Sequence, residues 1–238
     1  MRTTLKLAII AIILTLSNNA CTQPRYATDQ FDITEFSSIK SSVVGNINIR
    51  QSQSYKVTAD GSEDMLDILE VRVDNGTLIL DMDERQLKRI NKRANKLTIS
   101  ISTPTLNYID SEGVGNFVIE GTFETPELSI NSSGVGNLTA ENLNAGYINI
   151  DSEGVGNITI GGTSDKINIK SEGVGNVKAD KLKANSVFVT SEGVGNVSCF
   201  ATEYLKASSN GIGNITYYGK PKETDLSKNG IGKVRSGD

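Results

Sequence analysis

The chain has 238 residues, which allows one solenoid or two small domains, and it carries 24 basic against 28 acidic residues for a net charge of −4. This balance argues against a nucleic-acid partner. The chain has no histidine, so the commonest general base and metal ligand is missing, and 23 glycines with only 5% aromatic residues suit repetitive β-structure.

Residues 1–20 are expected to be an export signal of the lipoprotein type. Arg2 and Lys6 precede a ten-residue apolar run at 7–16, which is too short for a confident membrane span. Ala20 precedes Cys21, as in a bacterial lipoprotein signal, although Asn18 stands where leucine is usual. We therefore expect a lipid on Cys21 and a membrane-anchored protein of the bacterial envelope, in the outer membrane. Ordinary signal-peptidase cleavage near Ala20 is the alternative.

Residues 21–30 are predicted to be a polar tether, and 31–238 the folded domain. Removal of residues 1–20 takes away Arg2 and Lys6, which lowers the net charge of the chain from −4 to −6. Alternating apolar residues predict short strands around 31–33, 47–49 and 55–57. Ser62 is a candidate N-cap for one short helix over 62–69. Asn75-Gly76 predicts a type I′ turn within a hairpin over 70–81, and residues 97–101 form a further strand.

Residues 83–96 interrupt this pattern with a basic run. The segment has two interpretations, a contact with an anionic surface or polysaccharide, or a solvated excursion between two strands. Its basic residues are Arg85, Lys88, Arg89, Lys92, Arg93 and Lys96.

A hexapeptide, Ser-Glu-Gly-Val-Gly-Asn at 111–116, recurs in related form six more times at steps of 18 to 21 residues. A period near 20 is typical of one coil of a β-solenoid. An eroded copy stands at 42–46, where Val43 replaces the first glycine. The predicted corner glycines are Gly113, Gly115, Gly134, Gly136, Gly154, Gly156, Gly173, Gly175, Gly193, Gly195, Gly211, Gly213, Gly230 and Gly232.

Apolar residues alternate on both sides of every corner, so each unit reads as strand, Gly-x-Gly corner, strand and polar turn. One unit cannot bury its apolar face alone, whereas units stacked about 4.8 Å apart can. The predicted fold is all-β: a right-handed, single-stranded, β-helix-like solenoid with about 20 residues per coil. Its repeat-bearing part spans 106–235, with one short helix near the N-terminal end.

Stacked corners bring backbone close to backbone, which is why glycine is expected twice in each. The asparagine after the second glycine is predicted to form a ladder of amide hydrogen bonds between coils. The alternative is that asparagine simply tolerates the turn. The ladder candidates are Asn116, Asn137, Asn157, Asn176, Asn196 and Asn214.

Two further features bear on chemistry. Glu153, Glu172 and Glu192 should stack in a column, which could hold calcium or form a solvated acidic rim that discourages edge pairing. The spacing does not match calcium-binding β-rolls, so no metal site is predicted. Cys199 stands at an inward position and is expected to be a buried thiol rather than a nucleophile. No catalytic residue and no cofactor is predicted.

Several segments together resemble a known family. They are the early Phe31-x-Ile33 strand, the hairpin ending in Leu-Ile-Leu, residues 97–106, the Gly-x-Gly-Asn corners, and Tyr217-Tyr218-Gly219-Lys220-Pro221 before a last Gly-Ile-Gly corner. The pattern resembles the putative auto-transporter adhesin, head GIN domain family (DUF2807) of Bacteroidetes-type lipoproteins, over about residues 31–235. The resemblance implies a β-helix-like fold and an adhesive role without agreed catalytic residues. The family's corners usually read Ser-Gly-Ser-Gly, so the valine or isoleucine here is expected to point inward.

These observations predict a non-catalytic envelope lipoprotein with an adhesin or binding role through a repetitive solenoid surface. A purely structural envelope protein is the alternative, and a polysaccharide-acting enzyme is a weaker one. The expected partners are the membrane, through the lipid anchor, and a glycan or protein ligand. Self-association is compatible with the repeats.

Overall fold

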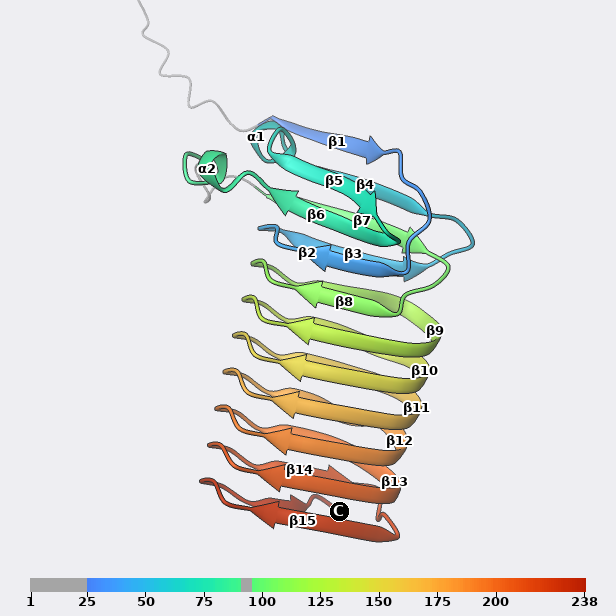
Figure 1. The fold of residues 1–238 in the computed structure, drawn as a ribbon, viewed down its shortest axis with the longest axis vertical. Coiled ribbons are helices and arrows are strands. Elements are labelled where there is room, and N and C mark those ends of the chain that lie inside the picture. Colours follow the sequence, from blue (N-terminus) through green and yellow to red (C-terminus); the bar gives the residue numbers. More distant parts are fainter. Residues whose placement is uncertain (1–24, 91–95) are drawn as a thin grey trace, which may run out of the picture.

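The computed structural model describes residues 25–90 and 96–238, which form a column of stacked β-coils (Figure 1). The structure is 67% strand and 3% helix, with about 20 residues per turn of the solenoid. The all-β solenoid predicted from the repeat is therefore confirmed.

The repeat-bearing half consists of parallel strands that pair with the strand one coil before and one coil after. Successive units match residue for residue, as where Leu138 and Ile158 pair between β10 and β11. The strands are β8 (Tyr108–Ser111), β9 (Phe117–Ser132), β10 (Leu138–Ser152), β11 (Ile158–Ser171), β12 (Val177–Ser191), β13 (Val197–Ser209), β14 (Ile215–Tyr218), β15 (Glu223–Lys228) and β16 (Val234–Ser236).

The expected polar turn in mid-unit is instead a bend inside a continuous strand. β9 runs through it from Phe117 to Ser132, and the pairing of β9 with β10 shifts register between Ala140 and Asn142. Each long strand thus contributes its first half to a rear sheet and its second half to a front sheet, which faces the viewer in Figure 1. The Gly-x-Gly corners connect the front sheet to the rear sheet of the next coil.

The core lies between the two sheets and is built from columns of inward side chains. Each column contains one residue per coil, and its aliphatic members lie almost wholly out of contact with water. Two columns are Phe117, Leu138, Ile158, Val177 and Val197 in the rear sheet and Leu128, Ile148, Ile167, Val187 and Leu205 in the front sheet. Burial of each such side chain contributes roughly 1.5–3 kcal/mol, and stacking is what makes the burial complete.

The first coil of the stack comes from a part of the chain that precedes the regular repeats. β2 lies between β6 and β8, and β3 lies between β7 and β9, so residues 38–51 are already one coil. Its corner is the eroded copy, in which Val44 pairs with Val114 of the next coil. The remaining N-terminal elements cover this coil. The elements are β1 (Tyr26–Phe31), β2 (Ser38–Ser41), β3 (Asn46–Gln51), β4 (Lys56–Ser62), α1 (Glu63–Leu66), β5 (Leu69–Asp74), β6 (Thr77–Met82), α2 (Glu84–Leu87) and β7 (Leu97–Thr103).

The covering elements pair antiparallel, unlike the coils. β4 joins β7, β1 joins β4, and β5 forms the predicted hairpin with β6. The turn of that hairpin has positive φ at both Asn75 and Gly76, as a type I′ turn requires. Antiparallel strands and the short helix α1 thus close one end of the column (Figure 1).

Two local predictions differ from the structure. Residues 26–30, assigned to a polar tether, form the edge strand β1, whose side chains are exposed and which is held by backbone pairing to β4. Because this strand buries none of these side chains, its sequence has no alternation of apolar residues that could have predicted it. Ser62 occupies the N-cap position of α1, but its hydroxyl makes no capping hydrogen bond, and the helix has a single turn.

Among the described residues, no helix combines the length and apolar character needed to cross a membrane. The predicted signal segment and Cys21 lie outside these residues.

Candidate binding surfaces

Each corner is a backbone contact between successive coils. The Val155 N–H donates to the Gly134 carbonyl at 2.9 Å, and the Gly156 N–H donates to the Val174 carbonyl at 3.0 Å. A β-carbon built on Gly173 would lie 2.1 Å from the carbonyl oxygen of Gly154. The corners therefore admit no side chain at the two glycine positions, because the preceding coil's backbone fills the space.

The asparagines beside the corners form a continuous hydrogen-bonded ladder. The side-chain oxygens from Asn116 to Asn196 accept from both the backbone N–H and the amide Nδ2 of the asparagine in the next coil, at 2.9–3.2 Å. The ladder ends at Asn214, whose oxygen accepts from the backbone N–H of Lys233. The ladder contains the six predicted asparagines, Asn116, Asn137, Asn157, Asn176, Asn196 and Asn214. It begins one coil earlier, because Asn46 accepts the same pair of bonds from Asn116. The Gly45-Asn46 pair in the eroded copy is the sequence signal for this additional member.

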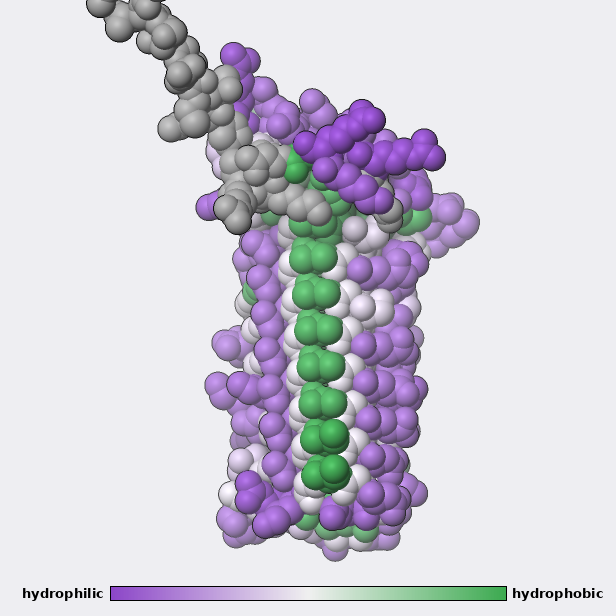
Figure 2. Space-filling view, turned by 90° about the vertical axis from the view of Figure 1, so that its left-hand side faces the viewer, coloured by the Kyte–Doolittle hydropathy of each residue, from purple (hydrophilic) through white to green (hydrophobic). Residues whose placement is uncertain are grey.

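The apolar residue between the two glycines points outward, so the expectation that it faces the core is wrong. Six of these side chains are 48–53% exposed and the last, Ile231, is 71% exposed. They form a straight apolar ridge along the column (Figure 2). We call this ridge the valine stripe. Its members are Val114, Val135, Val155, Val174, Val194, Ile212 and Ile231.

The reason for this orientation is that side-chain alternation continues unbroken through the corner. In the coil around Gly173, the buried residues are Ile169, Ser171 and Gly173, and the exposed one is Val174. Counting back from the buried Val177 gives the same result. Period two therefore assigns the glycines to the interior and the valine to the solvent.

The front sheet has an outward patch in which aromatic rings alternate with polar side chains. Lys166 places its Nζ 5.4 Å from the ring centre of Tyr147 and 4.9 Å from that of Phe188. Phe188 also packs against Tyr204, with ring centres 5.6 Å apart. Asn168 lies on β11 and donates to the side-chain oxygen of Asn149 at 2.7 Å. We call Tyr147, Lys166, Phe188, Tyr204, Asn149 and Asn168 the aromatic patch.

The predicted glutamate column is only partly a carboxylate cluster. Asp151, Glu153 and Glu172 have carboxylate oxygens within 4.8 Å of one another, and the group does not include Glu192. Lys170 forms an ion pair with Glu172, and this hydrogen bond raises the pKa of Lys170. At the start of the stack, Lys40 similarly pairs with Glu112 at 2.8 Å. Part of the acidic charge along this edge is therefore balanced by lysine.

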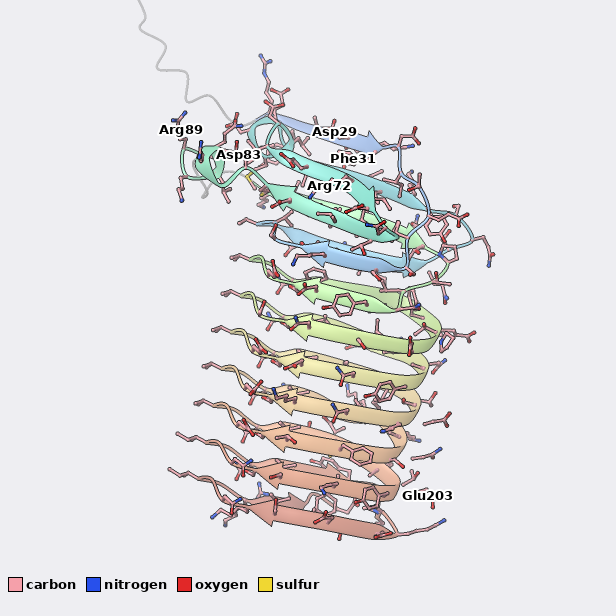
Figure 3. All side chains as sticks on the ribbon, viewed as in Figure 1. Asp29, Phe31, Arg72, Asp83, Arg89 and Glu203 are labelled. Atoms are coloured by element: carbon pink, nitrogen blue, oxygen red, sulfur yellow. The ribbon has the colours of Figure 1, made fainter. Side chains whose placement is uncertain are left out.

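The basic run follows β6 and begins with the short helix α2. The Asp83 carboxylate accepts hydrogen bonds from the side-chain amide of Gln86 and from the backbone N–H groups of Gln86 and Arg85, which hold the first turn and lower the pKa of Asp83. Figure 3 shows Asp83 and Arg89 at α2, beside the capped end of the column. Arg85, Lys88 and Arg89 are exposed, whereas Lys92 and Arg93 lie outside the described residues. The anionic-surface and solvated-excursion interpretations therefore both remain predictions.

The thiol of Cys199 lies in the core of β13 and is fully buried and unpaired. Burial, with a smaller contribution from the Asp180 carboxylate, raises the pKa of this thiol to about 12. A protonated thiol without access to solvent is a poor nucleophile.

These features define a class of protein: a rigid β-solenoid with a closed N-terminal end and repetitive, side-chain-decorated outer faces. The chain belongs to the family described as putative auto-transporter adhesin, head GIN domain, whose sequence profile matches residues 35–221.

Solved structures show the same fold. A putative adhesin from Bacteroides fragilis has a TM-score of 0.85 and 35% identity, covering 89% of this chain and 97% of that one. A putative lipid binding protein from Parabacteroides distasonis has a TM-score of 0.67 and 21% identity, covering 90% of this chain and 97% of that one. A putative adhesin from Parabacteroides merdae has a TM-score of 0.59 and 18% identity, with the same coverage of 90% and 97%. No curated protein matches the chain. The family and the Bacteroides fragilis neighbour support an adhesin-like role for a surface or extracellular protein.

Proposed function

We propose that the protein is an exported, non-catalytic lipoprotein, anchored in the outer membrane through Cys21, that binds a glycan with the aromatic patch of its front sheet. The adhesin family supports a binding role. The observation that carries the choice of surface is the grouping of aromatic rings on β10, β12 and β13: Lys166 lies beside both Tyr147 and Phe188, and Tyr204 packs against Phe188.

The chemistry of the patch suits a saccharide. The C–H face of a sugar ring is apolar and weakly positive, so it packs on the negative face of an aromatic ring. The amides of Asn149 and Asn168 offer both donors and acceptors to hydroxyl groups. Lys166 adds a positive charge beside the rings, which favours a glycan that carries carboxylate or sulfate. Because the sheet is rigid, little conformational entropy is lost on binding.

A glycan and matrix-protein array tests the proposal, using a chain that starts at Thr22 and so retains every described element. We expect binding to one or more acidic glycans, with at least tenfold weaker binding by the Tyr147→Ala/Tyr204→Ala variant. Tyr26→Ala is the matched control, because Tyr26 is an exposed tyrosine on β1 at the other end of the molecule. Binding only to proteins, equal loss in the control, or no binding at all would contradict the proposal. The last outcome would favour a structural envelope protein, and turnover of acidic polysaccharides would indicate an enzyme.

The anchor is tested separately. We expect the wild-type chain to partition with membranes and to carry acyl groups on an N-terminal Cys21 by mass spectrometry. Cys21→Ser should become soluble or stay unprocessed. An unmodified mature chain that begins at Cys21 would instead indicate ordinary signal-peptidase cleavage after Ala20.

A further inference from the structure

The valine stripe is an exposed apolar surface that the proposed glycan site does not use. Its seven side chains rise by about 4.8 Å per coil, so they form a ridge roughly 30 Å long. Half-exposed β-branched side chains in an unbroken row expose on the order of 500 Å² of apolar surface, which is at the upper end of what monomeric proteins leave uncovered. Such a surface on an otherwise polar column indicates an interface.

The backbone beneath the stripe offers no free hydrogen-bonding edge. Each corner inside the stack donates to both neighbouring coils: the Val174 N–H donates to the Gly154 carbonyl of the coil before, and the Gly175 N–H donates to the Val194 carbonyl of the coil after. A partner therefore cannot add a strand here and must pack against the side chains alone. The surface that matches a straight row of side chains with this spacing is another row with the same spacing.

A shallow trough runs beside the last four members of the stripe, from Val174 to Ile231, and can receive such a row. It lies over the first corner glycines, between the stripe and the acidic edge, and has a volume of about 580 Å³. Its floor includes Gly173, Gly193 and Gly211, and Glu172 and Glu192 line its far side. Because each first corner glycine faces the backbone of the preceding coil, no side chain points outward between the acidic edge and the stripe. The ridge of a second copy can therefore lie in this trough while its own trough receives the ridge of the first.

Charge selects the relative direction of the two copies. In each copy the acidic residues, such as Glu153, stand before the stripe and the asparagine ladder, such as Asn157, stands after it. A two-fold axis parallel to the column places the acidic edge of one copy against the asparagine ladder of the other. An axis across the column would instead place acidic edge against acidic edge, and opposed like charges destabilise an interface.

The asparagine ladder is suited to this contact. Each ladder amide, such as that of Asn157, donates one Nδ2 hydrogen to the asparagine of the preceding coil, and an amide nitrogen carries two. The second hydrogen can be donated to a carboxylate of the partner. A carboxylate acceptor makes this hydrogen bond stronger than one between neutral groups.

We propose that two copies of this chain associate side by side and in parallel, with each valine stripe packed in the glycine-lined trough of the other. The apolar area is smaller than the roughly 800 Å² per partner of a standard interface, so the dimer is a weak one that forms at high protein concentration. This proposal is independent of the glycan site, which lies on the front sheet.

Analytical ultracentrifugation of the chain from Thr22, over a micromolar-to-millimolar concentration range, tests the association. We expect a reversible monomer–dimer equilibrium whose association constant falls at least tenfold in Val155→Thr/Val174→Thr/Val194→Thr. Threonine has the shape of valine and a high strand propensity, so the fold is retained, which circular dichroism checks. Val118→Thr, at a half-buried outward position of β9 on the rear sheet, is the matched control and should leave the association unchanged.

Cross-linking with a short bis-maleimide tests the direction. In a parallel dimer, two copies of Val135→Cys cross-link to each other, and so do two copies of Ile212→Cys. When the two variants are mixed, with one made larger so that their products separate by size, no dimer that contains one copy of each should form. These positions are four coils apart, about 19 Å, beyond the reach of the reagent. The buried Cys199 should not react, and Val118→Cys measures random collisions.

A monomer at all concentrations, a dimer unaffected by the three threonines, or mixed Val135→Cys/Ile212→Cys dimers would overturn the proposal. The last result would indicate antiparallel packing. Loss of dimer in the threonine variant with self-linking at both cysteine positions supports it.

Discussion

Gly175 lies directly against Gly156 of the preceding coil: a β-carbon built on Gly175 would be 1.7 Å from the carbonyl oxygen of Gly156. Gly175 also has φ of +151°, which L side chains rarely adopt. Both conditions hold for the second glycine of every regular corner, because the coils superpose.

Gly175→Ala should destabilise the protein by on the order of 3–5 kcal/mol, since the new methyl group forces two backbones apart. Gly121→Ala is the control. Gly121 also has positive φ, +70°, but a β-carbon there meets nothing within 4 Å. Backbone strain alone should cost about 1–2 kcal/mol. Chemical denaturation gives both values, and equal midpoints for the two variants would show that coil contact does not set the glycine requirement.

Asn157→Ala should cost about 1–3 kcal/mol, because it leaves the backbone N–H and the amide of Asn176 without their shared acceptor. Asn229→Ala is the comparison: Asn229 is exposed and donates a single side-chain bond to Asn210. We expect its unfolding free energy to change by a few tenths of a kcal/mol. If Asn157→Ala changed the unfolding free energy equally little, the asparagines would serve only the local turn and would not stabilise the contact between coils.

The stability of the protein should fall above pH 9 partly because of Cys199. The folded thiol has a pKa of about 12 against an ordinary value of 9.0, so it keeps its proton while the unfolded thiol loses it. Unfolding therefore releases a proton between these values, and stability declines there by at most about 1.4 kcal/mol per pH unit. Cys199→Ala should show a shallower decline. Alanine fits, because Ala179 is the residue that pairs with Cys199 in the neighbouring coil. Parallel slopes for wild type and variant in denaturation between pH 8 and pH 11 would contradict this.

Calcium at millimolar concentration should shift the melting temperature little, although Asp151, Glu153 and Glu172 approach one another. Lys170 already neutralises part of this charge through Glu172, and the remaining repulsion near a wet surface is on the order of 1 kcal/mol. Glu153→Gln should therefore leave the fold intact or slightly stabilise it. A rise of about ten degrees with calcium, abolished in Glu153→Gln, would instead establish a metal site.

Much of the architecture could be read from the sequence because it is periodic. The step near 20 residues, the alternation around each corner and the paired glycines define a coil, and a coil can bury its apolar face only by stacking. The exposure of Val174 could also be predicted from the sequence, because side-chain alternation counted from Ile169 or from Val177 places it outward. Its apolar character favoured the opposite interpretation, but at a corner the alternation decides, because both neighbouring glycines already face the interior.

The sequence by itself determined the repeat, the strand faces and the corner chemistry, since each depends on spacing along the chain. Only the tertiary structure decided what covers the first coil. β1 is held by backbone bonds that leave no side-chain pattern, and residues 38–51 join the stack although more than 50 residues separate them from the next coil. Val43 is buried where later corners have glycine because the preceding strands, β6 and β7, are joined by residues 83–96 instead of a Gly-x-Gly corner. The grouping of Tyr147, Lys166 and Phe188 likewise depends on which coils are neighbours in space, and contacts between side chains distant in sequence are what folding adds to local pattern.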